Sequence, residues 1–143
     1  MTSMIDAADI DCAWLVSDIA DCLAAVVTAG AGPLPKGVFD GPVHLFDLEH
    51  RLRQLPVVGA ANALIEDGDM TSFLDLAKRG LFVFDWTDVY RTRRASIEAY
   101  ELVAVPACAI QTSDLPADLR VIAQRQRLSS AFGDHLTLDM LAT

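Results

Sequence analysis

The sequence has no long apolar run and no charged leader. Its longest stretch without a charged residue, residues 22–35, contains Thr28, two glycines and two prolines. A membrane helix needs about 20 predominantly apolar residues. Five acidic residues precede the first basic one, whereas a signal peptide begins with a positively charged segment. We therefore expect neither a membrane span nor a signal peptide.

Cysteines are few, and their spacing forms no known motif. Cys12, Cys22 and Cys108 are an odd number and include no Cys-x-x-Cys pair. This pattern predicts reduced cysteines that pack as small apolar side chains, and hence a cytoplasmic protein. Cys108 lies between alanines, where we expect a buried and unreactive thiol.

Basic residues are also scarce, which limits the partners of the chain. The 143 residues carry 11 Lys and Arg against 20 Asp and Glu, a net charge of −9. Residues 1–50 alone contain eight acids and one base. Such a surface disfavours nucleic acid and anionic lipid as non-specific partners.

The size and the apolar content indicate one domain that associates. A 15.5 kDa chain can hold a single core, so we assign residues 1–143 to one domain. Hydrophobic residues make up 52% of the sequence, which leaves apolar residues for the surface of so small a body. We therefore expect a homo-oligomer and a protein partner.

Hydrophobic spacing and helix-ending residues predict several helices. Apolar residues recur at helical steps between 6 and 28, and Leu45, Leu48, Leu52 and Leu55 repeat the pattern before Pro56. The further expected helices cover residues 57–66, a segment capped by Thr71 or Ser72 and ended by Gly80, and residues 113–130, capped at Ser113 and Asp114.

Two apolar segments predict strands. Residues 81–86 are rich in aromatic and branched side chains, and residues 100–105 follow the same pattern until Pro106 removes a backbone donor. The connector 87–99 fits a hairpin tip or a short helix, and we favour the hairpin. The sequence thus predicts an α+β fold, with three or more helices on a small, mostly antiparallel sheet built from 81–86 and 100–110.

The first candidate sites lack part of the pattern that their chemistry needs. The loop Gly30–Gly37 has the glycines and the lysine of a phosphate loop, but Pro33 and Pro35 remove backbone donors. The loop also follows an expected helix instead of a strand. Asp47, Glu49 and His50, with His44 nearby, offer too few aligned ligands for a metal.

Other groups have catalytic residue types without a recognisable arrangement. Ser129, Ser130, Asp134 and His135 lack the glycines of a nucleophile elbow. A set of carboxylates could serve acid–base chemistry if the fold paired them. Its members are Asp67, Asp69, Asp85, Asp88, Glu98 and Glu101.

One cluster of positive charge stands out as a candidate binding surface. Five of the eleven bases fall within seventeen residues. They are Lys78, Arg79, Arg91, Arg93 and Arg94. With the segment 73–79 as a groove-facing helix and the three later arginines at a wing tip, the order of elements fits a winged helix.

No catalytic, metal or cofactor motif is complete, so the sequence favours a non-enzymatic interaction or regulatory module that forms a homodimer. The first alternative is a winged-helix-like protein that binds nucleic acid through the five cationic residues. The second is a small enzyme with an unrecognised carboxylate site.

A salt series distinguishes the module from the nucleic-acid alternative. We expect no duplex binding near physiological salt, because the net charge of −9 opposes it. Filter binding or fluorescence anisotropy measures this directly. Salt-sensitive binding that the triple alanine variant of Arg91, Arg93 and Arg94 loses would favour the nucleic-acid alternative instead, with each removed arginine lowering the salt slope by roughly one.

Overall fold

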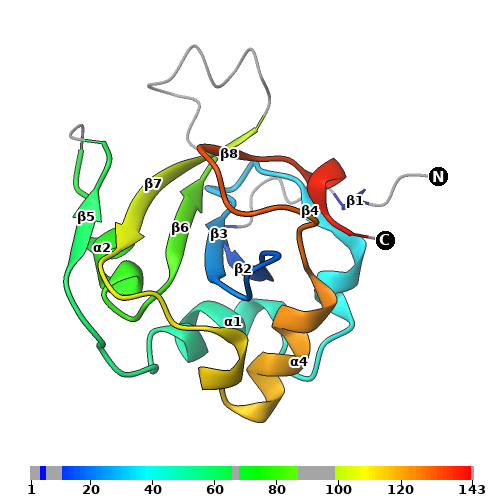
Figure 1. Ribbon diagram of the computed structural model, residues 1–143. Coiled ribbons are helices and arrows are strands. Elements are labelled where there is room, and N and C mark those ends of the chain that lie inside the picture. The colour runs from blue at the N-terminus through cyan, green and yellow to red at the C-terminus, as the bar shows by residue number, and fades with distance from the viewer. Residues whose placement is uncertain (1–3, 6–10, 66–67, 87–98, 143) are drawn as a thin grey trace.

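In the computed structural model the described residues form an α+β fold, in which three helices pack against one curled mixed sheet (Figure 1). The structure describes residues 4–5, 11–65, 68–86 and 99–142. The helices are α1 (Leu45–Leu52), α2 (Thr71–Ala77) and α4 (Ala117–Arg125). The strands are β1 (Met4–Ile5), β2 (Ala13–Ser17), β3 (Leu23–Val27), β4 (Leu34–Pro35), β5 (Ala61–Ala63), β6 (Phe82–Asp85), β7 (Tyr100–Pro106) and β8 (His135–Leu136). Three 3₁₀ turns are η1 (Lys36–Phe39), η2 (Thr112–Asp114) and η3 (Leu138–Met140).

The main sheet is larger than the sequence predicts, and it contains a parallel pair. Its order is β2-β3-β6-β7-β5, with β8 also paired to β7. β3 and β6 run parallel, and the other neighbours are antiparallel. The predicted pairing of 81–86 with 100–110 is confirmed in β6 and β7, but the small sheet and the winged-helix packing are not. No described helix is long and apolar enough to cross a membrane.

The helix predicted over residues 6–28 is wrong for the described residues 11–28, which form the antiparallel hairpin β2–β3. All five residues of β2 are buried, and so are the first four of β3. A strand that is covered on both faces loses the alternation that identifies a strand, so its apolar run also fits a helix. Asp18 fixes the turn, because its carboxylate accepts from the N–H groups of Ala20 and Cys22 at 2.9 and 3.0 Å.

The helix predicted over residues 57–66 is also wrong within the described residues 57–65. This segment contains β5 instead. The N–H groups of Val58 and Gly59 donate to the carbonyl of Lys78 at 2.9 and 3.3 Å, and Leu64 donates to Val103 at 2.8 Å. Contacts with distant residues therefore determine this segment, and local spacing could not show them.

The predicted cores of α1, α2, α4, β6 and β7 are confirmed. Leu45, Leu48 and Leu52 are buried on α1, and Gly80 follows α2 with a φ of +93°. The predicted caps are wrong. The N–H of Thr71 donates to Asp69 at 3.0 Å, with no side-chain cap on α2 itself, and the residues Ser113 and Asp114 belong to η2.

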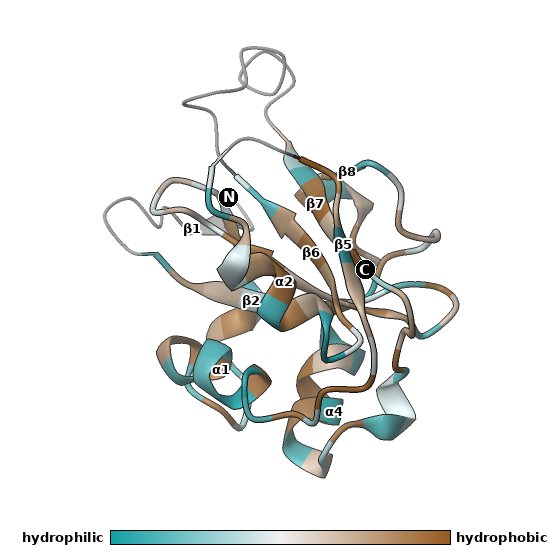
Figure 2. Ribbon diagram, turned by 90° about the vertical axis from the view of Figure 1, so that its left-hand side faces the viewer, coloured by the Kyte–Doolittle hydropathy of each residue, from teal (hydrophilic) through white to brown (hydrophobic). Residues whose placement is uncertain are grey.

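Both faces of the main sheet are covered. One face carries Leu15, Leu23, Val83 and Val103 and packs against the three helices. The other carries Trp14, Phe84 and Tyr100 and packs against β4, η1 and the C-terminal segment. Figure 2 shows hydrophobic residues along β6 and β7 and many hydrophilic ones on the outer sides of α1 and α4. The apolar surplus of the sequence therefore goes largely into two cores.

Phe84→Ala tests the second core. The ring of Phe84 has 0% exposure and lies 5.6 Å from that of Phe132, so its removal should lower the free energy of unfolding by ~3–5 kcal/mol. Urea denaturation measures the loss. Phe39→Ala is the control, because that ring is 44% exposed and should cost less than about 1 kcal/mol. Equal losses in the two variants would contradict this assignment of the core.

Candidate functional site

The cationic surface predicted from the sequence is only partly within the described residues. Lys78 is exposed just after α2, whereas Arg79 folds back onto the protein with its side chain 16% exposed. The Arg79 guanidinium donates to the carbonyl of Leu55 and, at 3.2 Å, to Asp75. Arg91, Arg93 and Arg94 lie outside the described residues. The cationic surface therefore stays a prediction in which Arg79 already has a structural role.

Other arginines also form ion pairs with carboxylates of the same chain. Arg53 extends from the end of α1 to Glu49 at 2.7 Å and to Asp75 of α2 at 2.8 Å. Arg127 pairs with Asp21 in the β2–β3 turn at 2.6 Å. These ion pairs connect elements far apart in the sequence and use positive charge that would otherwise lie free on the surface. The remaining surface charge is mostly acidic.

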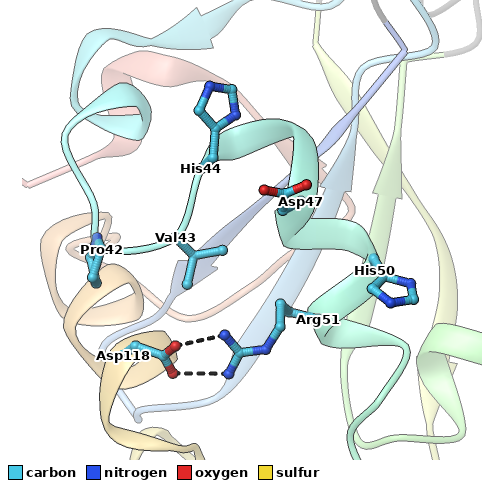
Figure 3. A pocket seen from close by; sticks show the side chains of 7 residues that line it. All are labelled: Pro42, Val43, His44, Asp47, His50, Arg51 and Asp118. Carbon is cyan, nitrogen blue, oxygen red and sulfur yellow. Dashed lines mark hydrogen bonds and ion pairs between the residues drawn. The ribbon is translucent and has the colours of Figure 1, made fainter.

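A hollow of about 390 Å³ opens beside α1 and α4 (Figure 3). It is lined by Pro42, Val43, His44, Asp47, His50, Arg51 and Asp118. Within this lining the Arg51 guanidinium makes two hydrogen bonds to Asp118, of 2.6 and 3.0 Å. Hydrogen bonding from Arg51 keeps the pKa of Asp118 below the ordinary carboxyl value of 3.8. The charge of Arg51 is therefore already neutralised.

The histidines of this hollow do not converge on a common point. His44 accepts the N–H of Phe46 through Nδ1 at 3.2 Å, and its ring lies 5.1 Å from that of Phe46. His50 bonds to the side chain of Gln54 at 3.2 Å. In Figure 3 the rings of His44 and His50 and the Asp47 carboxylate point in different directions. Within the described part of the chain, no three His, Cys, Asp or Glu side chains could hold a metal ion.

The fold does bring two of the candidate carboxylates together. Asp85 of β6 and Glu101 of β7 are direct partners in the ladder, and Glu101 is in turn the partner of His135 in β8. Asp85 is 3% exposed. Asp69 is far from this row, before α2, and the remaining three candidate carboxylates lie outside the described residues. The sequence could not reveal the contribution of His135, because β8 is too short to give a pattern.

The Gly30–Gly37 loop is a packed turn. It follows strand β3, and not a helix as the sequence predicts. The N–H groups of Ala31 and Gly32 donate to the carbonyl of Thr28 at 3.0 and 2.8 Å. The hydroxyl of Tyr100 donates to the carbonyl of Pro33 at 2.6 Å, and a Cβ on Gly32 would lie 2.4 Å from that hydroxyl. The two N–H groups thus close the turn, and the carbonyl of Pro33 holds Tyr100.

Ser129 and Asp134 have structural contacts, and the predicted burial holds for one of the two cysteines Cys12 and Cys108. Ser129 donates through its backbone to Met140, and the carbonyl of Asp134 accepts from Leu102, so both help to attach the C-terminal segment. Cys12 is buried as predicted, but Cys108 is exposed, so the predicted burial of Cys108 is wrong. It follows the end of β7, beyond the covered part of the sheet. The cytoplasmic location stays a prediction.

The outer edge of β5 is a surface that the sequence did not reveal. β5 pairs with β7 on one side, and no described strand pairs with the other side, which lies at the rim of the sheet in Figure 1. Residues 57–65 contain no charge. Val57 is 59% exposed and Leu64 52%. Exposed, uncharged sheet edges are a common place for another chain to bind.

The backbone of β5 has hydrogen-bonding groups directed outward. Ala60 accepts from Ala107, and Leu64 donates to Val103, so the residues at this spacing face β7. In an antiparallel ladder the intervening residues direct N–H and C=O to the opposite side. Ala61 and Ala63 therefore present both groups at the open edge. The missed signal was the uncharged run after Pro56, which helical spacing concealed.

Comparison of the chain with protein-family models, with curated proteins and with solved structures gives no match.

The Arg51–Asp118 pair gives a prediction for acid stability. Because the pKa of Asp118 is lowered in the folded protein, the charged carboxylate stabilises the fold above the ordinary value of 3.8, and this contribution is lost as the pH falls below it. Asp118→Asn should therefore lose less stability than the unsubstituted protein between about pH 5 and pH 2. Urea midpoints across that range measure the difference.

Asp134→Asn is the matched control for this prediction. Asp134 is exposed, and its side chain has no ion pair to the described residues. We expect its acid profile to follow that of the unsubstituted protein. An Asp118→Asn profile that is equally steep would show that the pair across α1 and α4 contributes nothing.

Proposed function

We propose that this protein is an interaction module that binds another polypeptide by adding a strand to the open edge of β5. The observation that carries the proposal is the uncharged edge segment 57–65, which is exposed at most of its residues, although Ile65 is buried, and which is paired on one side only among the described residues. Such strand addition obtains affinity from backbone hydrogen bonds and selectivity from flanking side chains.

Strand β2, at the opposite edge of the sheet, differs from β5. All residues of β2 are buried, and Ser17 exchanges backbone bonds of 2.9 and 2.8 Å with Gln126 and Leu128. That edge is therefore covered by the chain itself. Natural sheets protect exposed edges with a very short strand, lysine, proline or a bulge. β5 is short, at three residues, but residues 57–65 contain neither a lysine nor a proline.

Exposed apolar side chains flank the outward-facing backbone. Val57, Val58 and Leu64 are 59%, 39% and 52% exposed. An extended partner on this edge would cover part of them, which adds apolar burial to the hydrogen bonds of the ladder. The hollow beside α1 and α4 supports a ligand less well, because the Arg51 guanidinium in its lining is already paired with Asp118.

The enzyme alternative has one specific observation in its favour, the row of Asp85, Glu101 and His135. The row contains residue types for acid–base chemistry. Asp85 and Glu101 both have interactions within the chain, and Asp85 is only 3% exposed, which favours a structural role for this row. The interaction module therefore remains our proposal.

Ala63→Pro tests strand addition at this edge. Proline removes an N–H that faces away from β7, so the internal ladder should survive while the edge loses a donor. We expect the immobilised protein to retain a partner from its source-cell extract, and the amount retained by the variant should be at least tenfold lower. In the purified complex, hydrogen exchange should show slowed amides at residues 61–64.

Val121→Lys is the matched control for this experiment. Val121 lies on α4 and is 39% exposed, so the variant changes an exposed apolar residue away from β5. We expect it to retain the partner fully. Equal retention by Ala63→Pro, or slowed exchange elsewhere with none at residues 61–64, would overturn the proposed function.

A further inference from the structure

The segment that contains β5 has few buried side chains of its own. Leu55 and Ile65 are buried, but the nine residues between them are all exposed or half-buried. β5 itself is a three-residue strand, and β7 is its one partner strand among the described residues. Segments with few buried apolar contacts and exposed backbone hydrogen bonds open locally without global unfolding. Residues 56–64 therefore need contacts from outside the segment to stay closed on β7.

Such contacts come from the end of α2. The carbonyl of Lys78 accepts from the N–H groups of Val58 and Gly59 at 2.9 and 3.3 Å. The guanidinium of the next residue, Arg79, donates to the carbonyl of Leu55, just before the segment. α2 also contacts β5 and β7, beside which it lies in Figure 1. Two consecutive residues at one helix end thus hold the start of the segment.

A carboxylate on α2 fixes the direction of the Arg79 guanidinium. Asp75, one helical turn earlier, accepts from Arg79 at 3.2 Å and from Arg53 at 2.8 Å. Hydrogen bonds between charged groups are stronger than those between neutral ones. The two arginines and Asp75 therefore form a connected cluster between the end of α1 and the end of α2.

The end of α2 is firmly attached to the rest of the fold. Leu76 and Ala77 are fully buried in the core between the helices and the sheet. The carbonyl of Gly80 accepts from the N–H of Ile110 at 3.1 Å, and a Cβ on Gly80 would lie 2.7 Å from the Ile110 side chain. Arg79 therefore connects a fixed part of the molecule to a segment with little burial.

We propose that residues 56–64 open from β7 as one unit, and that Arg79, held by Asp75, is the latch that keeps this unit closed. The role of the latch rests on the proposed function, because a partner strand needs an ordered β5 edge to pair with. The apparent affinity of such a site falls with the fraction of molecules in which the edge is closed. Arg79 is thus a positioning residue, which acts through Leu55 and not by contact with a partner.

Amide hydrogen exchange, followed by NMR on the free protein, tests the latch through Arg79→Gln. The variant removes the charge and the paired donors of the guanidinium. Amides whose hydrogen bonds break when the segment opens should then exchange at least tenfold faster, because hydrogen bonds to charged groups contribute more than neutral ones. These are the amides of Val58, Gly59, Leu64 and Ala107. The amides of Trp86 and Ile110, which bond to other elements, should keep their rates.

Arg51→Gln is the matched control, because Arg51 also makes two hydrogen bonds to a carboxylate but contacts Asp118 instead of this segment. It should leave the four amides unchanged. Asp75→Asn is a second variant in case Arg79→Gln does not fold, which circular dichroism checks. Arg79 can still reach Leu55 in that variant, so the same four amides should accelerate by a smaller factor. Unchanged rates at these amides in either folded variant, or an equal rise at Trp86 and Ile110, would overturn the inference.

The exchange experiment needs no partner, so the latch and the proposed function can fail separately. Local opening in Arg79→Gln, together with a partner that Ala63→Pro still retains, would keep the latch and remove strand addition. A partner that Ala63→Pro loses, with four amides that Arg79→Gln leaves unchanged, would keep strand addition and remove the latch.

Discussion

The fold depends on covering the strands β2, β3 and β6 on both faces. Trp14 and Leu15, adjacent in β2, enter opposite cores, and Phe84 and Val83 do the same in β6. This requires two separate layers, one built from the three helices and the other from β4, η1 and the C-terminal segment. The hydroxyl of Tyr100 joins the second layer to the sheet through Pro33. With both faces covered, edges and strand ends remain for contact with other molecules.

The same burial explains what the sequence could and could not predict. Residues at the boundary of a core and solvent show the period of their element, so α1 and α4 were predicted with their buried leucines. β2 and β3 have no solvent face and no period, and their apolar run resembled a helix. The prediction for β5 failed for another reason. The carbonyl of Lys78 and strand β7, which are far from β5 in the sequence, hold this segment in place. The edge surface was missed along with it.

Several arginines form ion pairs with acidic residues of distant elements. Arg51 and Arg53 connect α1 to α4 and to α2, and Arg127 fixes the β2–β3 turn. The isolated charge pattern predicted a cationic surface, but pairing in the fold depends on neighbours that only the structure supplies. Arg79 shows this most clearly, since it binds Leu55 and Asp75 instead of facing outward. The chain as a whole keeps a net charge of −9.

The net negative charge of the chain affects how the exposed β5 edge can associate. An uncharged edge on a neutral protein would pair with many strands and would be an aggregation hazard. Here the net charge of −9 opposes close approach of copies, although residues 57–65 themselves carry no charge. Long-range repulsion between copies thus opposes the open-ended association that an exposed, uncharged strand edge would otherwise favour.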